Sequence, residues 1–341
     1  MEQKQLDWQN LGFEYHETPY RYVANYSDGT WHEGELTTSN AIPMNESAAV
    51  LQYCQTIFEG MKAYRTKDGR VVTFRPDLNA ERMIDSAKQL EMPPISKEQF
   101  LEAVTEVVLH NSDYIPPYGS GASLYIRPYM FATTPLIGVK PANDYQFRVF
   151  ASPVGPYFAG GVRPLTLCVA ESDRSAPRGT GHVKAGLNYA MSLHALMDAK
   201  RRGYDENMYL DSATRTYVEE TGGANFIFVD QEGTLVTPKS DTILPSITRR
   251  SLLEVAKTYF GMKVEERAVA WTELSKFTEC GLCGTAAVLS PVGCIVREEE
   301  VIRFASNQEG RGPVTQKLYD TLVGIQYGEI EAPEGWIYEL A

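Results

Sequence analysis

The chain has 341 residues, of which 43% are hydrophobic and 22% are charged, and its formal net charge is −12. This length and balance are typical of a globular protein of about two domains, and they exclude a disordered chain, a collagen-like repeat and a disulfide-built mini-protein. The acidic charge argues against nucleic acid or an anionic membrane surface as a partner.

The first half of the chain alternates between strand-like and helix-like segments, which predicts a mixed α/β (α+β) fold. A strand over residues 69–74 leads into a helix with apolar positions on one side over residues 78–90. A second helix is predicted from Ser96, because Gln99 follows at the capping-box spacing. The next predicted elements are two strands, at residues 123–131 and 145–154.

A stretch rich in glycine and proline interrupts this pattern. It predicts an interdomain loop over residues 155–165, between a smaller N-terminal domain over 1–154 and a larger C-terminal domain over 166–341. In the larger domain a helix is predicted over about 184–202, because cations followed by glycine are typical of a helix C-terminus. The other predicted elements are strands at 164–170, 208–210, 216–218, 226–229 and 234–237, and helices at 246–261 and 314–327.

Missing motifs argue against several common chemistries. The chain has no glycine-rich phosphate loop of the NAD or ATP type, no Gly-x-Ser-x-Gly elbow, and no histidine spacing that suits a metal. Cys280 and Cys283 have C-x-x-C spacing without a second pair, and we interpret them as small residues of a half-buried strand rather than a redox pair. Sparse cysteines, a polar N-terminus and the lack of an apolar run of about 20 residues predict a cytoplasmic protein without a membrane span.

A few positions carry candidate chemistry. Lys184 is predicted at a helix start, where the helix dipole disfavours its cation, and a neutral lysine amine can form a Schiff base with an aldehyde. Glu219 and Glu220 lie at a strand end beside glycines, from which a carboxylate can reach a cleft. The amides after Ser246 open a helix and suit a phosphate, to which Arg75 can add a contact. Taken singly, each is more commonly an ordinary surface or capping residue.

As an ordered set, these segments resemble a known signature. Residues 220–226, 235–237 and 244–249 resemble the class IV (fold type IV) pyridoxal-phosphate aminotransferases. Further stretches resemble the branched-chain amino acid aminotransferase branch, at residues 58–64, 74–76, 123–128, 135–139, 155–158, 184–189, 284–287 and 325–328. The resemblance covers nearly the whole chain. It implies a two-domain enzyme of fold type IV with pyridoxal 5'-phosphate between the domains.

The resemblance implies a role for each residue of a cofactor site. Lys184 is implied as the catalytic residue, which bonds to the cofactor and then moves the substrate proton. Glu220 is implied as the partner of the pyridinium nitrogen, which keeps the ring an electron sink. Tyr189 is implied to contact the 3'-oxygen of the ring. The other implied cofactor-binding residues are Arg75, Ile247, Thr248 and Thr285 at the phosphate, Arg174 near it, and Asn225.

A substrate pocket is implied in the same way. Its walls are implied to be Phe58, Tyr125 and Tyr157, closed by Tyr53 and, from the partner subunit of a homodimer, by Ile137 and Val139. The backbone of Thr285 and Ala286 is implied to hold the substrate carboxylate. Arg127 fits the distal carboxylate of glutamate, with tyrosine hydroxyls helping. One methylene group changes the binding free energy in an apolar pocket by only about 1–3 kcal/mol. Activity on leucine, isoleucine and valine is therefore expected.

The implied reaction is a ping-pong transfer of the amino group between L-leucine, L-isoleucine or L-valine and 2-oxoglutarate. Two other enzymes of the same fold remain as alternatives, a D-amino acid or amine transaminase and an aminodeoxychorismate-type lyase. Paired assays of L- and D-leucine separate the first, and pyruvate release without an amino acceptor reveals the second. A cofactor-binding protein without catalysis is the non-enzymatic alternative, and it predicts bound cofactor but no half-reaction.

Overall fold

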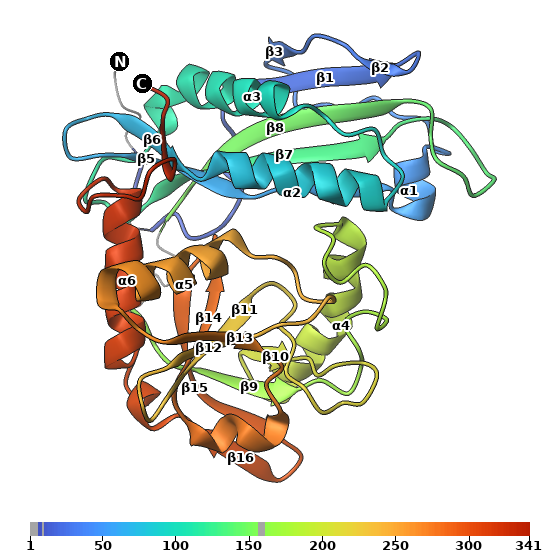
Figure 1. The fold of residues 1–341 in the computed structure, drawn as a ribbon. Coiled ribbons are helices and arrows are strands. Elements are labelled where there is room, and N and C mark those ends of the chain that lie inside the picture. The colour runs from blue at the N-terminus through green and yellow to red at the C-terminus, as the bar shows by residue number, and fades with distance from the viewer. Residues whose placement is uncertain (1–5, 9, 156–160) are drawn as a thin grey trace. The chain divides into compact units, whose positions relative to one another are not determined.

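The computed structural model describes residues 6–8, 10–155 and 161–341, and its contacts divide the chain into two compact units (Figure 1). Unit 1 consists of Met1–Ala159, Val183–Leu187 and Ile325–Ala341, and unit 2 of Gly160–His182 and Asn188–Gly324. The predicted division at residues 155–165 puts Val183–Leu187 and Ile325–Ala341 in the C-terminal domain. In the structure, both segments belong to unit 1. The segment Val183–Leu187 joins unit 1 because Ala185 forms a β-bridge with Ile57, and the C-terminus joins it because its last strand pairs with a strand of the unit 1 sheet.

Unit 1 is built on a nine-stranded antiparallel sheet in the order β17-β6-β5-β7-β8-β1-β2, with β3 paired to β1 and β4 to β7. Hydrophobic side chains of β7 and β8 that point to one face form its core together with two helices. The strands are β1 (Arg21–Ser27), β2 (Thr30–Trp31), β3 (Glu35–Thr37), β4 (Thr56–Phe58), β5 (Met61–Arg65), β6 (Val71–Phe74), β7 (Ser123–Ala132), β8 (Tyr145–Val154) and β17 (Ile337–Glu339).

Helices cover one face of this sheet. α2 (Pro76–Gln89) and α3 (Lys97–His110) pack on it, and α1 (Ala49–Tyr53) is a short helix near β7 (Figure 1). Ser96 caps α3 as predicted, because its hydroxyl oxygen accepts a hydrogen bond from the amide of Gln99 at 3.1 Å. The side chain of Gln99 donates instead to the carbonyl oxygen of His32 at 3.0 Å. The opposite face of the sheet carries the alternate residues of these strands, among them Tyr125, Arg127, Arg148 and Phe150.

Unit 2 is built on an eight-stranded mixed sheet in the order β10-β9-β15-β14-β11-β12-β13, with β16 paired to β15. The pairs β9/β10, β9/β15 and β12/β13 are parallel and the others are antiparallel. Its core contains the packed rings of Phe226, Phe228 and Phe304. The strands are β9 (Leu165–Val169), β10 (Glu206–Met208), β11 (Asn225–Asp230), β12 (Leu235–Pro238), β13 (Val264–Arg267), β14 (Phe277–Gly284), β15 (Val288–Arg297) and β16 (Glu300–Arg303).

The remaining helices are α4 (Gly186–Arg201), α5 (Ile247–Phe260) and α6 (Pro313–Gln326), with short 3-10 turns at Ser112–Tyr114, Trp271–Lys276 and Ala305–Asn307. α5 agrees with the predicted helix, since Ser246 caps it and Gly261 ends it in the left-handed region at a φ of 60°. The strands predicted at 208–210 and 216–218 are wrong in extent, because β10 ends at Met208 and only an isolated bridge joins Leu210 to Val218. In the described part of the chain, no helix is long and apolar enough to cross a membrane.

Candidate active site

Lys184 is fixed through its backbone within unit 1. Its amide donates a hydrogen bond to the hydroxyl oxygen of Ser86 on α2 at 3.1 Å, and its carbonyl oxygen accepts one from the amide of Phe58 at 3.0 Å. The predicted helix over 184–202 is wrong at its start, because α4 begins at Gly186 and Ala185 is instead bridged to Ile57. The position of Lys184 is therefore set by a sheet edge and by α2, not by the first turn of a helix.

One predicted substrate residue, Phe58, lies beside the amine of Lys184, and a second, Arg127, lies against the ring of Phe58. Its Nζ lies 4.6 Å from the centroid of the Phe58 ring, and the Cζ atom of Arg127 lies 4.8 Å from the same centroid. Arg127 donates from Nη2 to the hydroxyl of Tyr125 at 3.0 Å, while its buried Nε has no hydrogen-bond partner among the described residues. This part of unit 1 therefore combines an amine, an aromatic face and a guanidinium with an N–H left for a ligand.

A buried ion pair holds the turn after Phe58. Glu59 is 0% exposed, and Arg82 on α2 binds its two carboxylate oxygens through Nε and Nη2, each at 2.8 Å. Asn79 adds a hydrogen bond at 2.7 Å. Arg82 and Ser86 lie one turn apart on α2, so one helix face holds both this turn and the amide of Lys184.

Sequence reasoning missed Ser86, Glu59 and Arg82. The available signal was the presence of polar residues at 79, 82 and 86, among the apolar positions of the predicted helix. The next residue in the turn, Gly60, has no room for a side chain, because a Cβ atom there would lie 2.1 Å from the hydroxyl oxygen of Tyr125. Glycine is therefore needed at this position for Tyr125 to reach Arg127.

Arg75 lies directly after β6 at the N-cap of α2, in the left-handed region with a φ of 48°. This conformation is unusual for a residue other than glycine. The amide of Arg75 donates to the carbonyl oxygen of Trp336 at 2.8 Å, and its Cζ atom lies 4.4 Å from the Trp336 ring centroid. The C-terminal segment thus holds the guanidinium in place.

Of the other predicted pocket residues, Tyr157 lies outside the described residues. The hydroxyl of Tyr53 donates to the carbonyl oxygen of Ile137. The side chains of Ile137 and Val139 are 85% and 84% exposed, and Leu51 beside Tyr53 is also exposed. The structure thus groups Tyr53 with Ile137 in an exposed apolar area of unit 1.

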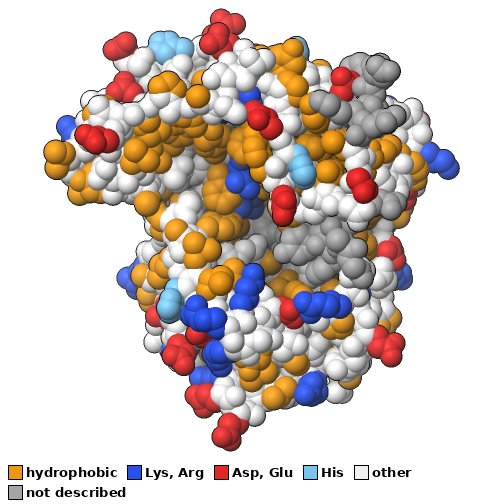
Figure 2. All heavy atoms as spheres, turned by 180° about the vertical axis from the view of Figure 1, so that it is seen from behind, with side chains coloured by type: hydrophobic (Ala, Val, Ile, Leu, Met, Phe, Trp, Pro, Cys, Tyr) orange, Lys and Arg blue, Asp and Glu red, His pale blue; other side chains and the backbone are white. Residues whose placement is uncertain are grey.

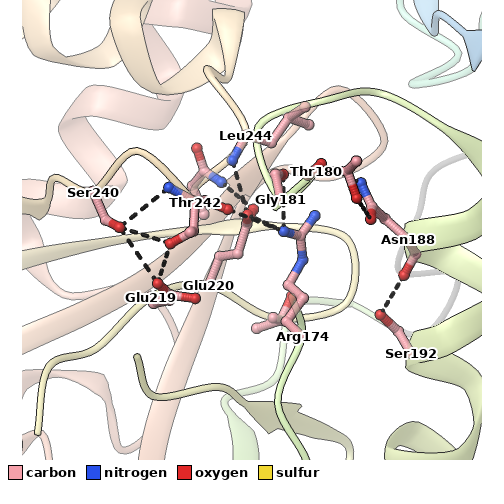
Figure 3. Close-up of polar contacts among 12 residues, drawn as sticks. Arg174, Thr180, Gly181, Asn188, Ser192, Glu219, Glu220, Ser240, Thr242 and Leu244 are labelled. Atoms are coloured by element: carbon pink, nitrogen blue, oxygen red, sulfur yellow. Dashed lines mark hydrogen bonds and ion pairs between the residues drawn. The ribbon is translucent and has the colours of Figure 1, made fainter. Parts of the chain in front are cut away.

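Glu220 is the centre of a polar cluster in unit 2 (Figure 3). It is 2% exposed, and its Oε1 contacts Arg174 Nη1 and the amide of Leu244, each at 2.8 Å. Its Oε2 accepts a hydrogen bond from Nδ2 of Asn225 at 2.7 Å. Burial raises the pKa of Glu220 to about 7, and the nearby charge of Arg174 opposes this shift.

The structure places Arg174 against Glu220. Its Nη1 also donates to the carbonyl oxygens of Gly181 and Thr242, at 2.9 and 3.3 Å. The resemblance implies that Arg174 lies near the cofactor phosphate, and this role stays a prediction. The adjacent carboxylate, Glu219, is also buried, but it accepts hydrogen bonds from the hydroxyls of Thr242 and Ser240 (Figure 3). Glu220 is therefore the carboxylate of the pair that holds a cation.

The helix start predicted to bind phosphate adjoins this cluster. Leu244, whose amide is bound by Glu220, leads into Ser246, and the hydroxyl oxygen of Ser246 accepts a hydrogen bond from the amide of Arg249 at 3.2 Å. The amides of Ile247 and Thr248 begin α5 and have no acceptor within the helix by its geometry. Together with the helix dipole, they favour an anion.

The remaining predicted cofactor residues lie in unit 2. Thr285 and Ala286 form the turn between β14 and β15. Asn225 pairs with Cys283 on β14, so this turn follows the strand beside Glu220. Tyr189 lies in the first turns of α4, half-buried. Unit 2 therefore brings Glu220, Asn225 and the turn to one end of its sheet.

Cys280 and Cys283 lie on β14, which confirms that they are strand residues, although they are fully buried rather than half-buried. Both are free thiols. Burial raises the pKa of Cys283 to about 12 and that of Cys280 well above its ordinary value. Because the thiolate is the reactive form, these cysteines are suited to packing and not to redox chemistry.

Comparison with known proteins decides the family. Residues 56–295 match the family model described as amino-transferase class IV. The chain is 48% identical over 342 residues to a branched-chain-amino-acid aminotransferase of Haemophilus influenzae, with 99% of each chain covered. The chain belongs to the class IV aminotransferases. Among them, the resemblance to the branched-chain amino acid branch is thereby confirmed.

Solved structures of class IV aminotransferases share the fold. A branched-chain amino acid aminotransferase of Escherichia coli matches with a TM-score of 0.80 and 28% identity, over 95% of this chain and 100% of that chain. A second branched-chain amino acid aminotransferase, solved with pyridoxamine 5'-phosphate, matches with a TM-score of 0.78 and 27% identity, over 93% and 98%. The predicted mixed α/β fold of type IV is confirmed.

Proposed function

We propose that this protein is a pyridoxal 5'-phosphate-dependent branched-chain amino acid aminotransferase. It transfers the amino group between L-leucine, L-isoleucine or L-valine and 2-oxoglutarate. The observation that carries the proposal is the fixed backbone of Lys184, whose Nζ lies beside the Phe58 ring that also faces Arg127, in a chain of this family. A lysine amine over an apolar wall, with a guanidinium next to it, suits an amino acid that has either an aliphatic or an acidic side chain.

The donor set of the chain fits pyridoxal phosphate. An aldehyde needs an amine, which Lys184 supplies. A protonated ring nitrogen needs a buried carboxylate, which Glu220 supplies. The two carboxylate oxygens of Glu220 are held in place by Arg174, Leu244 and Asn225. A phosphate needs cations and free amides, which Arg75 and the start of α5 supply.

When bound, the cofactor supplies an electron sink for the charge that develops at the substrate Cα. The residues of the chain provide the proton chemistry and the binding. The Nζ of Lys184 would move the proton between the substrate Cα and the C4′ atom of the cofactor. The Glu220 carboxylate keeps a proton on the ring nitrogen, because a buried negative charge favours a cation beside it. The roles that the resemblance implies for Tyr189, Asn225, Ile247, Thr248, Thr285 and Ala286 stay predictions.

Arg127 is proposed to separate the two kinds of substrate. Its Nε is buried without a partner among the described residues, and Tyr125 orients its Nη2. A glutamate carboxylate can accept from this guanidinium, whereas a leucine side chain uses the Phe58 ring beside it. This arrangement accounts for a pocket that accepts both substrates in turn.

A homodimer is proposed with this activity. Ile137 and Val139 are almost fully exposed in one chain, and Leu51 and Tyr53 expose further apolar surface. Figure 2 shows broad areas of hydrophobic side chains over unit 1, in the upper part of the picture. A second copy that covers such surface gains the usual free energy of apolar burial. A cytoplasmic setting is proposed as well, since all five cysteines are free.

The test is the visible absorbance of the purified holoenzyme. We expect L-leucine alone to remove the yellow band of the bound cofactor, and 2-oxoglutarate to restore it. A band that ignores L-leucine but responds to D-amino acids or other amines would assign the protein to the D-amino acid or amine transaminases. Pyruvate release without an acceptor would assign it to the lyases. No yellow band after addition of pyridoxal phosphate would refute the cofactor assignment.

A further inference from the structure

Unit 1 contains a pocket of about 290 Å³ that none of the residues assigned above lines. Its walls include Tyr15, Arg21, Asn40, Tyr129, Arg148 and Phe150. Arg148 pairs with Tyr129 of β7 and with Val23 of β1. Its neighbours on β8, Phe147 and Val149, point into the core, so Arg148 points to the opposite face of the sheet.

Arg148 is a buried charge without a carboxylate partner among the described residues. Its side chain is buried, with the residue 5% exposed, and it forms no ion pair within the part of the chain that the structure describes. It donates from Nη1 to the side-chain oxygen of Gln146 at 3.0 Å and from Nη2 to the carbonyl oxygen of Ser39 at 3.1 Å. These contacts use two of the five N–H groups of a guanidinium. Buried charges in proteins are normally paired, which points to an anion in this pocket.

A second guanidinium strengthens the positive charge. Arg21 is 4% exposed and binds the carbonyl oxygens of Thr18 and Thr38. Its one carboxylate contact among the described residues is with Glu17 at 3.4 Å, and Glu17 is more than half exposed. Burial, and to a smaller extent the charge of Arg21, lower the pKa of Arg148, whereas Tyr129 opposes this shift.

Three aromatic side chains also line the pocket. The ring of Phe150 meets that of Tyr15 edge-on at 5.8 Å between centroids and that of Tyr129 at 5.9 Å. Burial raises the pKa of Tyr129, so its hydroxyl stays protonated and can donate a hydrogen bond. At the roughly 30 Å³ that each water molecule takes up in the liquid, the pocket has room for about ten non-hydrogen atoms. Such walls suit an anion with a short apolar body.

We propose that this pocket is a binding site for a small organic carboxylate with an apolar body. The carboxylate accepts hydrogen bonds from Arg148 and from the hydroxyl of Tyr129, and the apolar body packs on Phe150 and Tyr15. The site uses none of the residues proposed for catalysis, so it stands whether or not the aminotransferase activity is as proposed. It belongs to unit 1 alone.

The probe is isovalerate, which has neither an amino nor an oxo group and cannot be turned over. Its binding to the holoenzyme is measured by equilibrium dialysis. We expect Arg148→Gln to weaken one class of isovalerate site by about tenfold or more, since a charged hydrogen-bond partner is lost. Aminotransferase activity in the absence of isovalerate is expected to stay unchanged. Arg303→Gln, at an exposed arginine of β16, is the control and should keep wild-type binding.

A second variant separates the loss of a binding group from the loss of the fold. Tyr129→Phe removes one hydroxyl and keeps the ring, and it should weaken the same class of site severalfold without a change in thermal unfolding. Isovalerate binding that is identical in the wild type, Arg148→Gln and Tyr129→Phe would overturn the proposal. Loss of the dimer in Arg148→Gln, with no isovalerate site affected, would also overturn it, because a carboxylate of a second copy would then be the group that Arg148 binds.

Discussion

The hydroxyl oxygen of Ser86 accepts a hydrogen bond from the amide of Lys184, although 98 positions separate the two residues. α2 thereby fixes the backbone that carries the proposed catalytic amine. The same helix fixes Glu59, next to the Phe58 amide that binds the carbonyl oxygen of Lys184. The site thus depends on polar residues of a helix that contacts no substrate in the proposed mechanism.

Ser86→Ala is expected to lower kcat more than it changes KM. The variant removes the acceptor of the Lys184 amide, a loss of about 1–3 kcal/mol, and loosens the amine relative to the Phe58 ring. The measurement is steady-state kinetics with L-leucine and 2-oxoglutarate. Thr105→Val is the matched control, because the hydroxyl of Thr105 on α3 binds only a carbonyl oxygen of its own helix. Equal kcat values for Ser86→Ala and the wild type would contradict this role.

Lys184→Ala is expected to abolish turnover and to leave the fold intact. The side chain is only partly buried, and its backbone hydrogen bonds to Ser86 and Phe58 do not need it. Turnover is followed by glutamate formation, and folding by thermal unfolding monitored with circular dichroism. Wild-type rates in this variant would remove Lys184 from the mechanism.

Arg82→Gln is expected to destabilise the protein strongly, by about 3–5 kcal/mol, because it leaves the buried Glu59 carboxylate without its cation. The free energy of unfolding from urea titration measures this cost. The double variant Glu59→Gln/Arg82→Gln should recover part of the loss, since no buried charge is left unpaired. If the double variant were as unstable as the sum of both single variants, the two residues would not act as a pair.

Glu220 is expected to make the stability of the cofactor-free enzyme fall as the pH rises. Its pKa is about 7 in the folded chain, against an ordinary value of 4.5, so the folded state binds more protons between these pH values. Its stabilising contribution is fully present below about pH 4.5 and is lost as the pH rises through 7.

Urea unfolding between pH 5 and 8, with Glu220→Gln as the reference, isolates this contribution. The difference in free energy of unfolding, wild type minus variant, should decrease over this range. If this difference in free energy does not change with pH, the pKa of Glu220 is not raised in the folded chain. In the holoenzyme, Glu220→Gln should also lower turnover strongly, and an unchanged rate would favour Glu219 as the functional carboxylate.

Arg127→Ala is expected to impair the half-reaction with glutamate more than that with leucine. Only glutamate has a distal carboxylate for the guanidinium that Tyr125 orients. Single-turnover rates with each amino acid measure the ratio. Equal losses for both substrates would remove the proposed role in selecting the dicarboxylate.

Local patterns in the sequence determined much of the architecture. The strands at 69–74, 123–131 and 145–154 and the capped helices from Ser96 and Ser246 are all present, because alternation, apolar periodicity and capping are properties of a few neighbouring residues. The order of short motifs also identified the family, since many weak matches in one register combine into a specific signal. The roles of individual site residues follow from that resemblance and are what the variants above test.

Tertiary structure alone decided how these residues are held. The strand β15 escaped prediction, and β14 was expected only around Cys280 and Cys283. Lys184 lies before its helix, because a bridge from Ala185 to Ile57 outweighs the helical pattern of the following residues. The hydrogen bond from Lys184 to Ser86 and the pair of Glu59 with Arg82 join positions far apart in the chain. The burial of Arg148, without a carboxylate partner among the described residues, also depends on the folded chain. The sequence can place polar residues on an apolar helix face, but only the folded chain decides which polar groups meet and which are removed from water.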